Sequence, residues 1–229
     1  IPSRLMYLDR IRRQFDKSMD IDERKIKSIV EKMEKRQEYS GEETKLISDG
    51  LENLEEFKTL ANKKKAPTSS PLASSEVARK EGEKNAIGMV SITIRASAHQ
   101  IIAYQWDHTL RIHNSAETIN NRDIDVVNDH NKLVYMVLVQ PNPISDRDVV
   151  MRYTWKKLEE KGSSYAFNIT PEIHDGYPAN SGDLVRAQYY NTIKLIQLGK
   201  SEARIECLVR LDIGGNDFGG LVTNFLNLR

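Results

Sequence analysis

The sequence predicts an α+β protein in which an α-helical N-terminal region precedes a domain of long antiparallel strands. Nearly half of residues 1–65 are charged, and the apolar residues among them recur at helical spacing. From residue 86 onward, apolar and polar residues alternate in several runs that short turn-like sequences connect. Short connections favour antiparallel pairing, and the few helical segments beside these runs complete the α+β pattern.

Three narrow apolar stripes predict three helices in residues 1–65, each otherwise charged. The stripes are Leu5, Leu8, Ile11, Phe15 and Met19; then Ile26, Ile29, Val30 and Met33; then Ile47, Leu51, Leu54, Phe57 and Leu60. Ser40 and Glu43 have the spacing of a capping box before the third helix. Helices of this coiled-coil-like pattern need a partner surface, which we expect to be one another or the following domain.

Residues 66–85 are predicted to be a flexible linker between the helical region, 1–65, and a second domain, 86–229. The first ten residues of the linker, APTSSPLASS, contain two prolines and four serines and show no periodicity. Lys63, Lys64 and Lys65 come directly before it, and we expect them to form a solvated helix end. The alternative for this triple lysine is contact with an anionic membrane.

The second domain is predicted to begin with a short strand and a helix that starts after Ser97. Six further strands and a last helix from Gly220 follow. The predicted strands are 90–95, 123–127, 132–139, 148–157, 165–170, 184–198 and 203–213.

The overall composition excludes several classes of protein for this chain. The formal net charge is +1 with 29% charged residues, so no global field draws the chain to nucleic acid. The single cysteine, Cys207, excludes a disulfide framework and fits a reducing compartment. No apolar run approaches the ~20 residues of a membrane span. We therefore expect a soluble, cytoplasmic chain, and the first residue, Ile1, suggests a piece of a longer protein.

Candidate catalytic and metal-binding residues are few. The five histidines are His99, His108, His113, His130 and His174. They lack HExxH spacing and have one cysteine to join them, so we expect no metal. The glycine-rich segment 212–220 lacks the Lys-Ser/Thr ending of a P-loop, and the sequence contains no GxSxG motif to make a triad with His174. We expect no cofactor and no enzymatic activity.

Four segments in order resemble a known family. They are ASAHQIIAYQWD (96–107), NPISDRDVVMRY (142–153), GDLVRAQYY (182–190) and RLDIGGNDFGGLVTNFL (210–226). Together they resemble START domains, the lipid-binding helix-grip modules related to steroidogenic regulators, from roughly Arg95 onward. The resemblance implies a curved antiparallel sheet wrapped on a C-terminal helix over an apolar tunnel. Because the sequence stops at Arg229, we expect this closing helix to be incomplete.

The resemblance also implies a structural role for four charged residues at strand ends. Arg147 and Asp148 match the family's Arg-Asp pair at a strand start, and Arg186 and Asp212 match two further framework charges. We expect these charges to hold strands and loops in register and to leave the ligand to the strand middles.

The side chains expected to line the tunnel share one face of the strand 148–157 and have inward neighbours on two other strands. They are Val149, Met151, Tyr153, Trp155, Tyr135, Tyr190 and Thr192. The alternative is that this face is ordinary filled core.

One departure from the family bears on the ligand. Family members that bind a sterol or a phospholipid head often place a cavity-facing arginine where this sequence has Tyr153, and Arg152 is expected to point to the opposite face. The run 132–139 also contains no acid for a buried ion pair. We therefore expect a largely apolar ligand held without an ion pair.

Two functions follow as predictions. The first is non-catalytic binding of a lipid, either a sterol, a fatty acyl chain or a phospholipid, with transfer or sensing as its purpose and transient membrane contact as a consequence. The second is a regulatory module of a larger protein that binds a protein partner through residues 1–65. Nucleic acid is not an expected partner, because no basic patch with interleaved aromatic residues is present in the sequence.

Overall fold

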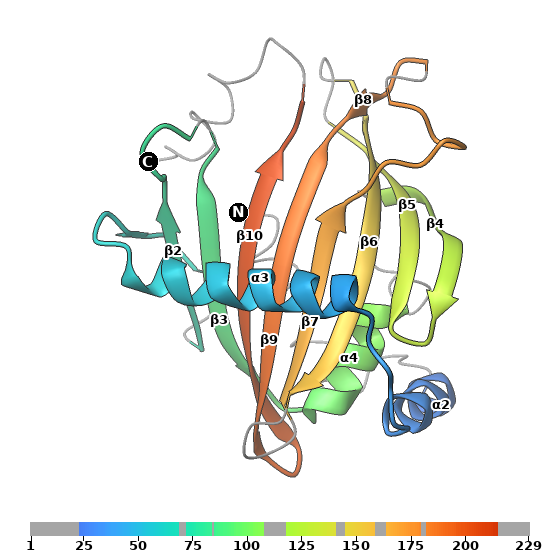
Figure 1. The fold of residues 1–229 in the computed structure, drawn as a ribbon. Coiled ribbons are helices and arrows are strands. Elements are labelled where there is room, and N and C mark those ends of the chain that lie inside the picture. The colour runs from blue at the N-terminus through green and yellow to red at the C-terminus, as the bar shows by residue number, and fades with distance from the viewer. Residues whose placement is uncertain are drawn as a thin grey trace.

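A computed structural model describes residues 23–68, 72–83, 85–107, 118–140, 145–158, 164–179 and 182–214. The helices in these ranges are α2 (Glu23–Met33), α3 (Gly41–Thr59) and α4 (Ala98–Trp106). The strands are β1 (Lys64–Lys65), β2 (Ala73–Ala78), β3 (Ile87–Ile94), β4 (Thr118–Asn128), β5 (Asn131–Leu138), β6 (Arg147–Leu158), β7 (Ser164–Pro171), β8 (Val185–Arg186), β9 (Gln188–Gly199) and β10 (Glu202–Asp212). Figure 1 shows their arrangement.

The strands form a single sheet in the order β1-β2-β3-β10-β9-β7-β6-β5-β4, with the short β8 paired to β6. Neighbours along this order are antiparallel, and only the β6–β8 pair among the described strands is parallel. The α+β class with a large antiparallel sheet, as predicted from the sequence, is confirmed. The helices predicted at 5–19 and from Gly220 lie outside the described residues.

The predicted strand 184–198 is divided in two at Ala187. Before it, β8 pairs with the start of β6, and the Ala187 backbone N–H donates to the Asp148 carbonyl at 2.9 Å. After it, β9 pairs with β7 and β10. The chain thus changes partner at this point, which alternation of apolar residues alone cannot reveal. Each of the other predicted strands overlaps one strand of the sheet.

The predicted flexible linker is wrong in part, because Ala73–Ala78 form strand β2 and pair with β3 along its length. The lysine run is also not a helix end. Helix α3 ends at Thr59, and Lys64 and Lys65 form β1 beside β2. Small residues such as Ser74 have weak strand propensity, and the pairing with β3 overrides it.

The sheet has two faces, which we call inner and outer. Helix α3 lies across the outer face, in front of the strands in Figure 1, whereas α4 packs on the inner face with α2 beside it. Lys25 of α2 and Asp107 at the end of α4 form an ion pair at 2.8 Å. The protein therefore has three layers, with the sheet between α3 and the pair α2–α4.

Helix α3 begins as the sequence predicts. The Ser40 hydroxyl accepts from the Glu43 backbone N–H, and the Glu43 carboxylate accepts from the Ser40 backbone N–H at 2.8 Å. At its other end, Leu54 and Phe57 are buried against apolar residues of the outer face. These are Ala78, Ile87, Met89 and Leu208. The apolar stripe of this helix is thus used within the chain.

Gly50 allows α3 to approach the sheet. A Cβ atom at this position would lie 2.8 Å from Thr192 Oγ1 and 2.9 Å from Asn168 Oδ1. The Asn168 side chain in turn donates to the Leu46 carbonyl of the helix at 2.7 Å and accepts from the Thr192 hydroxyl at 2.9 Å. A side chain on residue 50 would press on these hydrogen-bonded groups.

We predict that Gly50→Ala lowers the melting temperature, although alanine favours helices over glycine by about 1 kcal/mol. The reason is the contact of the new methyl group with Asn168 and Thr192. Gly41→Ala is the matched control, since nothing lies within 4 Å of a Cβ at Gly41. Thermal melts of both variants test this, and an equal rise in melting temperature for both would contradict the close approach of α3.

Candidate functional site

The inner face of β6 consists of large apolar side chains. Val149, Met151, Tyr153 and Trp155 alternate along the strand, and each is at most 2% exposed. The Tyr153 ring packs edge-on against the Phe167 ring of β7, with 5.3 Å between the ring centres. The Trp155 indole N–H donates to the Asp129 carbonyl at 3.0 Å. These four residues do share a face, and their role in lining a ligand cavity stays a prediction.

Apolar residues continue this face across the neighbouring strands. The pairing registers place Val134 of β5 opposite Met151, Phe167 of β7 opposite Trp155, and Ile193 of β9 opposite Phe167. Further buried residues on β3, β7, β9 and β10 belong to the same cluster. They include Val90, Ile92, Ile94, Ile169, Leu195, Ile205 and Cys207. The inner face is therefore apolar over six strands.

The two inner helices complete the cluster from one end. Ile101 and Ile102 of α4 are fully buried, and Ile26 and Met33 of α2 are nearly so. Helix α4 also begins as predicted, with a capping box between Ser97 and Gln100. The inner face thus lies beneath helices whose own apolar sides point to the sheet.

Three of the residues expected to face inward lie on the outer face instead. Tyr135 is opposite Val150, and both belong to an outer cluster with Tyr177. Thr192 is opposite Asn168 beneath α3. Tyr190 lies one alternation further along β9, on the same side as Thr192. The prediction was wrong because it could not set the register of β5 and β9 against β6, and a shift of one residue reverses the face.

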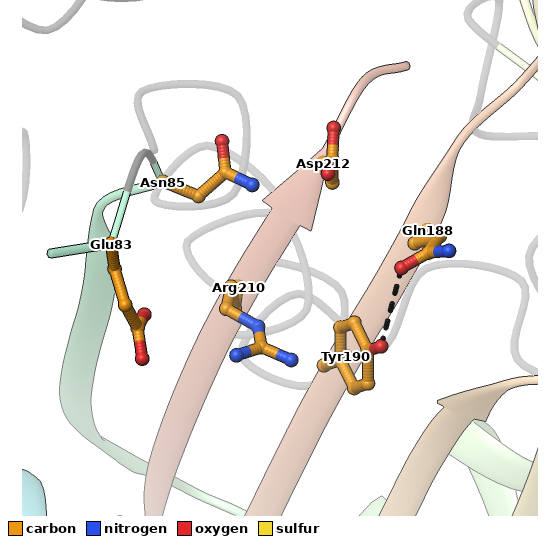
Figure 2. Close-up of a pocket in the computed structure, with 6 residues that line it drawn as sticks. All are labelled: Glu83, Asn85, Gln188, Tyr190, Arg210 and Asp212. Carbon is orange, nitrogen blue, oxygen red and sulfur yellow. Dashed lines mark hydrogen bonds between the residues drawn. The ribbon is translucent and has the colours of Figure 1, made fainter.

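Tyr190 belongs to a shallow polar pocket of about 310 Å³ on the outer face. Figure 2 shows its lining, which is Glu83, Asn85, Gln188, Tyr190, Arg210 and Asp212. The Arg210 guanidinium lies 4.1 Å from the Tyr190 ring centre, and the Tyr190 hydroxyl donates to Gln188. Charges of both signs line this pocket and are open to water, so it is unsuited to a lipid chain.

Lys132 is an inner-face residue that the sequence reasoning missed. It pairs with Tyr153 in the register of β5 and β6, and its side chain is 3% exposed. Its ammonium lies 2.9 Å from Asp123 Oδ1 and 3.0 Å from Asp123 Oδ2 on β4. It also lies 4.6 Å from the centre of the Trp106 ring and 5.9 Å from that of Tyr153. The inner face therefore carries an ion pair within the chain, and a ligand held without an ion pair of its own stays a prediction.

The face of Lys132 follows from the faces of its neighbours on β5. Lys132 and Val134 alternate with Tyr135, so the prediction that turned Tyr135 inward turned Lys132 outward, and the observed register reverses both. The buried pair of the family was expected to need an acid on 132–139 and an arginine on the next strand. Here the cation is on β5 and the acid is on β4, the reverse of that expectation.

Several uncharged polar groups also lie on the described part of the inner face. The Cys207 thiol donates to the Asn191 side-chain oxygen at 3.1 Å between β10 and β9. The Tyr165 hydroxyl is buried next to His99 of α4, and burial raises the pKa of this phenol to about 12. Hydroxyl and amide groups of this kind are able to bind the polar end of a neutral ligand.

The four predicted framework charges lie at strand ends. Asp148 accepts two hydrogen bonds from the Arg186 guanidinium at 2.9 and 2.7 Å, and Arg186 also donates to the Tyr177 carbonyl at 2.9 Å. Arg147 donates to the carbonyls of Ile213 and Ser145, joining the start of β6 to the end of β10. Asp212 accepts from the Gly214 backbone N–H. These contacts support the predicted structural role.

Arg152 points to the outer face, as predicted from the alternation along β6. It donates to Glu172 at 2.7 Å and to the Asn131 side-chain oxygen at 3.1 Å. Its guanidinium is therefore engaged on the side of the sheet opposite Met151.

A buried carboxylate fastens α3 to the turn between β4 and β5. Glu43 accepts from the side chains of Asn128 and Asn131 at 3.0 and 2.8 Å, and His130 Nε2 lies 3.3 Å away. Burial raises the pKa of the Glu43 carboxyl, but hydrogen bonds from the Ser40 backbone, Asn128, Asn131 and His130 outweigh it and lower the pKa to about 2. This carboxylate is thus a structural anion.

The histidines show no metal arrangement within the described ranges, where no three His, Cys, Asp or Glu side chains converge. His99 packs on Tyr165, His130 joins the Glu43 network, and His174 accepts from the Gly176 backbone N–H in a turn. His108 and His113, and most of the glycine-rich segment 212–220, lie outside the described residues.

Several solved structures have a fold similar to that of this chain. The crystal structure of human STARD10 matches with a TM-score of 0.68 and 19% identity, over 84% of this chain and 75% of that chain. The human StarD13 (DLC2) lipid transfer and protein localization domain matches with a TM-score of 0.60 and 14% identity, over 83% and 91%. Human StAR-related lipid transfer protein 5 matches with a TM-score of 0.63 and 13% identity, over 82% and 90%.

At these identities the likeness shows a shared fold, and the START-like fold indicated by the sequence motifs is confirmed. A match over 84% of the chain is longer than residues 86–229, so the shared fold begins before the predicted limit at residue 86. No protein-family model matches the sequence, and no curated protein matches it. Within the described ranges, no helix combines the length and apolarity needed to cross a membrane.

We predict that Asp148→Asn lowers the free energy of unfolding by about 3 kcal/mol, because it leaves the Arg186 guanidinium without its carboxylate at a largely buried site. The control is Asp49→Asn, which removes the exposed ion pair with Lys45 and should leave the free energy of unfolding almost unchanged. Urea unfolding of both variants measures the difference. Equal, small losses would mean that the Asp148–Arg186 pair is no framework contact.

Glu43 should make the stability of the fold depend on pH in the acid range. Because its folded pKa is below the ordinary value of 4.5, its contribution is complete above pH 4.5 and is lost as pH falls towards about 2. Between pH 7 and pH 3 the free energy of unfolding of the wild type should fall by about 2 kcal/mol more than that of the Glu43→Gln variant. Urea midpoints at both pH values test this. Glu42→Gln, on the exposed side of the same turn, should keep the wild-type loss.

Proposed function

We propose, on the premise of a START-like fold, that this protein binds a lipid against the inner face of its sheet without catalysing a reaction. The observation that carries the proposal is the continuous apolar inner face, which spans six strands and lies beneath α2 and α4. The names of the structures with the same fold describe lipid transfer. Transfer of a lipid between membranes, or sensing of its level, is the purpose we propose for this chain.

The energetics favour a ligand with long apolar parts. Each methylene group removed from water contributes about 0.8 kcal/mol, so an acyl chain or a sterol skeleton supplies most of the binding free energy without directional contacts. The inner face offers it Val149, Met151 and Ile193 along with aromatic rings. Hydroxyl, thiol and amide groups at Tyr165, Cys207 and Asn191 suit the polar end of such a ligand.

Binding is a better account of the inner face than catalysis. On the described part of this face, Lys132, Asp123 and the strand-end Arg147 are each engaged with another group of the chain, and the His99 ring packs on Tyr165. General acid–base chemistry requires a titratable group within hydrogen-bond reach of the substrate. The contacts of these charges instead hold β4, β5, β6 and β10 together.

The packing of α3 weakens the case for the alternative function, a protein-interaction module. Its apolar residues Leu54 and Phe57 are buried on the sheet, so this part of residues 1–65 is used inside the domain. We propose that the chain acts in the cytoplasm with transient contact to membranes, where a lipid enters or leaves. A protein partner on the remaining N-terminal residues is compatible with lipid binding.

Native mass spectrometry of protein purified from cells tests the proposal. We expect an added mass of a lipid, which denaturation releases and lipid analysis identifies. Incubation with vesicles of mixed sterol, fatty acid and phospholipid, followed by re-isolation, extends the test to protein that was purified empty. A protein that acquires no lipid from either source would contradict the proposed function.

We predict that Met151→Arg abolishes lipid acquisition, because it places a charge in the middle of the apolar inner face. Ile193→Trp is a neutral second variant that fills the same face from β9, and it should reduce acquisition at least several-fold. Arg152→Gln is the control on the outer face and should bind as the wild type does.

Circular dichroism and thermal melts show which of these variants are folded, and binding is compared among the folded ones. Loss of binding in Arg152→Gln with normal binding in Ile193→Trp would place the ligand on the outer face.

A further inference from the structure

The Lys132 ammonium occupies a site built from two aromatic rings and a carboxylate. The rings of Trp106 and Tyr153 lie 4.6 and 5.9 Å from its nitrogen, and the Asp123 oxygens lie at 2.9 and 3.0 Å. These groups come from α4, β6 and β4, so three separate elements converge on one cation. The site lies on the inner face, where β5 runs next to the end of α4.

Aromatic faces together with an acid are the chemistry that binds a quaternary ammonium group. Lys132 places a cation of the chain itself at this position. A ligand with a choline or similar head group would have to displace a tethered ammonium from its carboxylate, or would meet it as a like charge. A ligand with an anionic or uncharged polar end meets no such repulsion.

The exposure of the two partners shows how this site could meet a ligand. The Lys132 side chain is 3% exposed, whereas that of Asp123 is 33% exposed. The pair therefore runs from the interior to the border with solvent. The polar end of a lipid whose tail lies on the apolar inner face belongs at such a border, because the head group stays close to water.

We infer that Lys132 determines head-group selectivity, by filling the aromatic and carboxylate site with a cation of the chain and so disfavouring lipids whose head group ends in a quaternary ammonium. This inference rests on the proposed lipid binding and narrows its ligand class. The ligand is a lipid with an anionic or uncharged polar end, and a choline lipid of the same chain length is a poor competitor.

Another lysine provides the matched control. The Lys156 ammonium also lies over a tyrosine ring, 5.1 Å from the centre of Tyr39, but Lys156 occupies the outer-facing alternation of β6 next to Trp155. Removing its charge changes the net charge by the same amount as removing that of Lys132. Any effect of Lys132 on selectivity should be missing in Lys156→Met.

The experiment measures lipid acquisition from vesicles that contain equal amounts of phosphatidylcholine, phosphatidylglycerol and diacylglycerol with identical acyl chains, read by native mass spectrometry. The wild type and Lys156→Met should acquire little phosphatidylcholine. Lys132→Met should raise the share of phosphatidylcholine about tenfold relative to the wild type, since the rings and Asp123 become available to choline. Lys132→Arg should keep the wild-type preference.

A double variant separates this mechanism from a purely structural role. Lys132→Met with Asp123→Asn removes both charges and keeps the rings, so the gain in phosphatidylcholine should be at least several-fold smaller than in Lys132→Met alone. The double variant is also informative if the unpaired Asp123 carboxylate unfolds the single variant. Because neither charge is then left unpaired, Lys132→Met with Asp123→Asn should fold and bind diacylglycerol. Thermal melts identify the folded variants.

The outcomes distinguish the two proposals. A wild type that acquires none of the three lipids contradicts the proposed function. A wild type that acquires phosphatidylcholine as readily as the others overturns the role of Lys132 while lipid binding stands. The same holds if folded Lys132→Met keeps the wild-type preference, or if the double variant gains as much phosphatidylcholine as the single one.

Discussion

The two-residue period of β6 is the constraint on which the rest of the structure depends. Its odd-numbered residues from Val149 to Trp155 face α2 and α4, and its even-numbered residues face the layer of α3. Each neighbouring strand must match this division, because side chains opposite one another in a sheet share a face. The Asp148–Arg186 pair and the Arg147 contacts lie at the start of the strand, where the register is set.

This constraint explains what could be predicted from the sequence. Within one strand, alternation alone assigns faces, so the four inner residues of β6 and the outer position of Arg152 were placed correctly. The cap of α3 depends on two residues three apart, and Ser40 was identified for that reason, whereas Ser97 was identified as the residue before a helical pattern. The strand-end charges were found through the resemblance of the motifs that contain them.

The remaining features depend on pairing between distant segments. The registers that turn Tyr135 and Thr192 outward are set by contacts with β6 and β7, which a single sequence does not contain. Strand β2 has weak local propensity and forms because β3 is there to pair with it. The Lys132–Asp123 site joins β4, β5, β6 and the end of α4, and the face of Lys132, like that of Tyr135, depends on the register of β5.

Strand β4 has a consequence for how the molecule behaves in a crowded solution. Among the described strands it is the last on its side of the sheet, and its pairing with β5 is interrupted by register shifts at three places. Val126 and Val127 are more than half exposed there, next to Asp125. A regular edge strand would allow a strand from a second copy of the chain to pair with it and extend the sheet. The irregular backbone of β4 opposes such growth, so it protects the protein from aggregation through an edge that carries exposed valines.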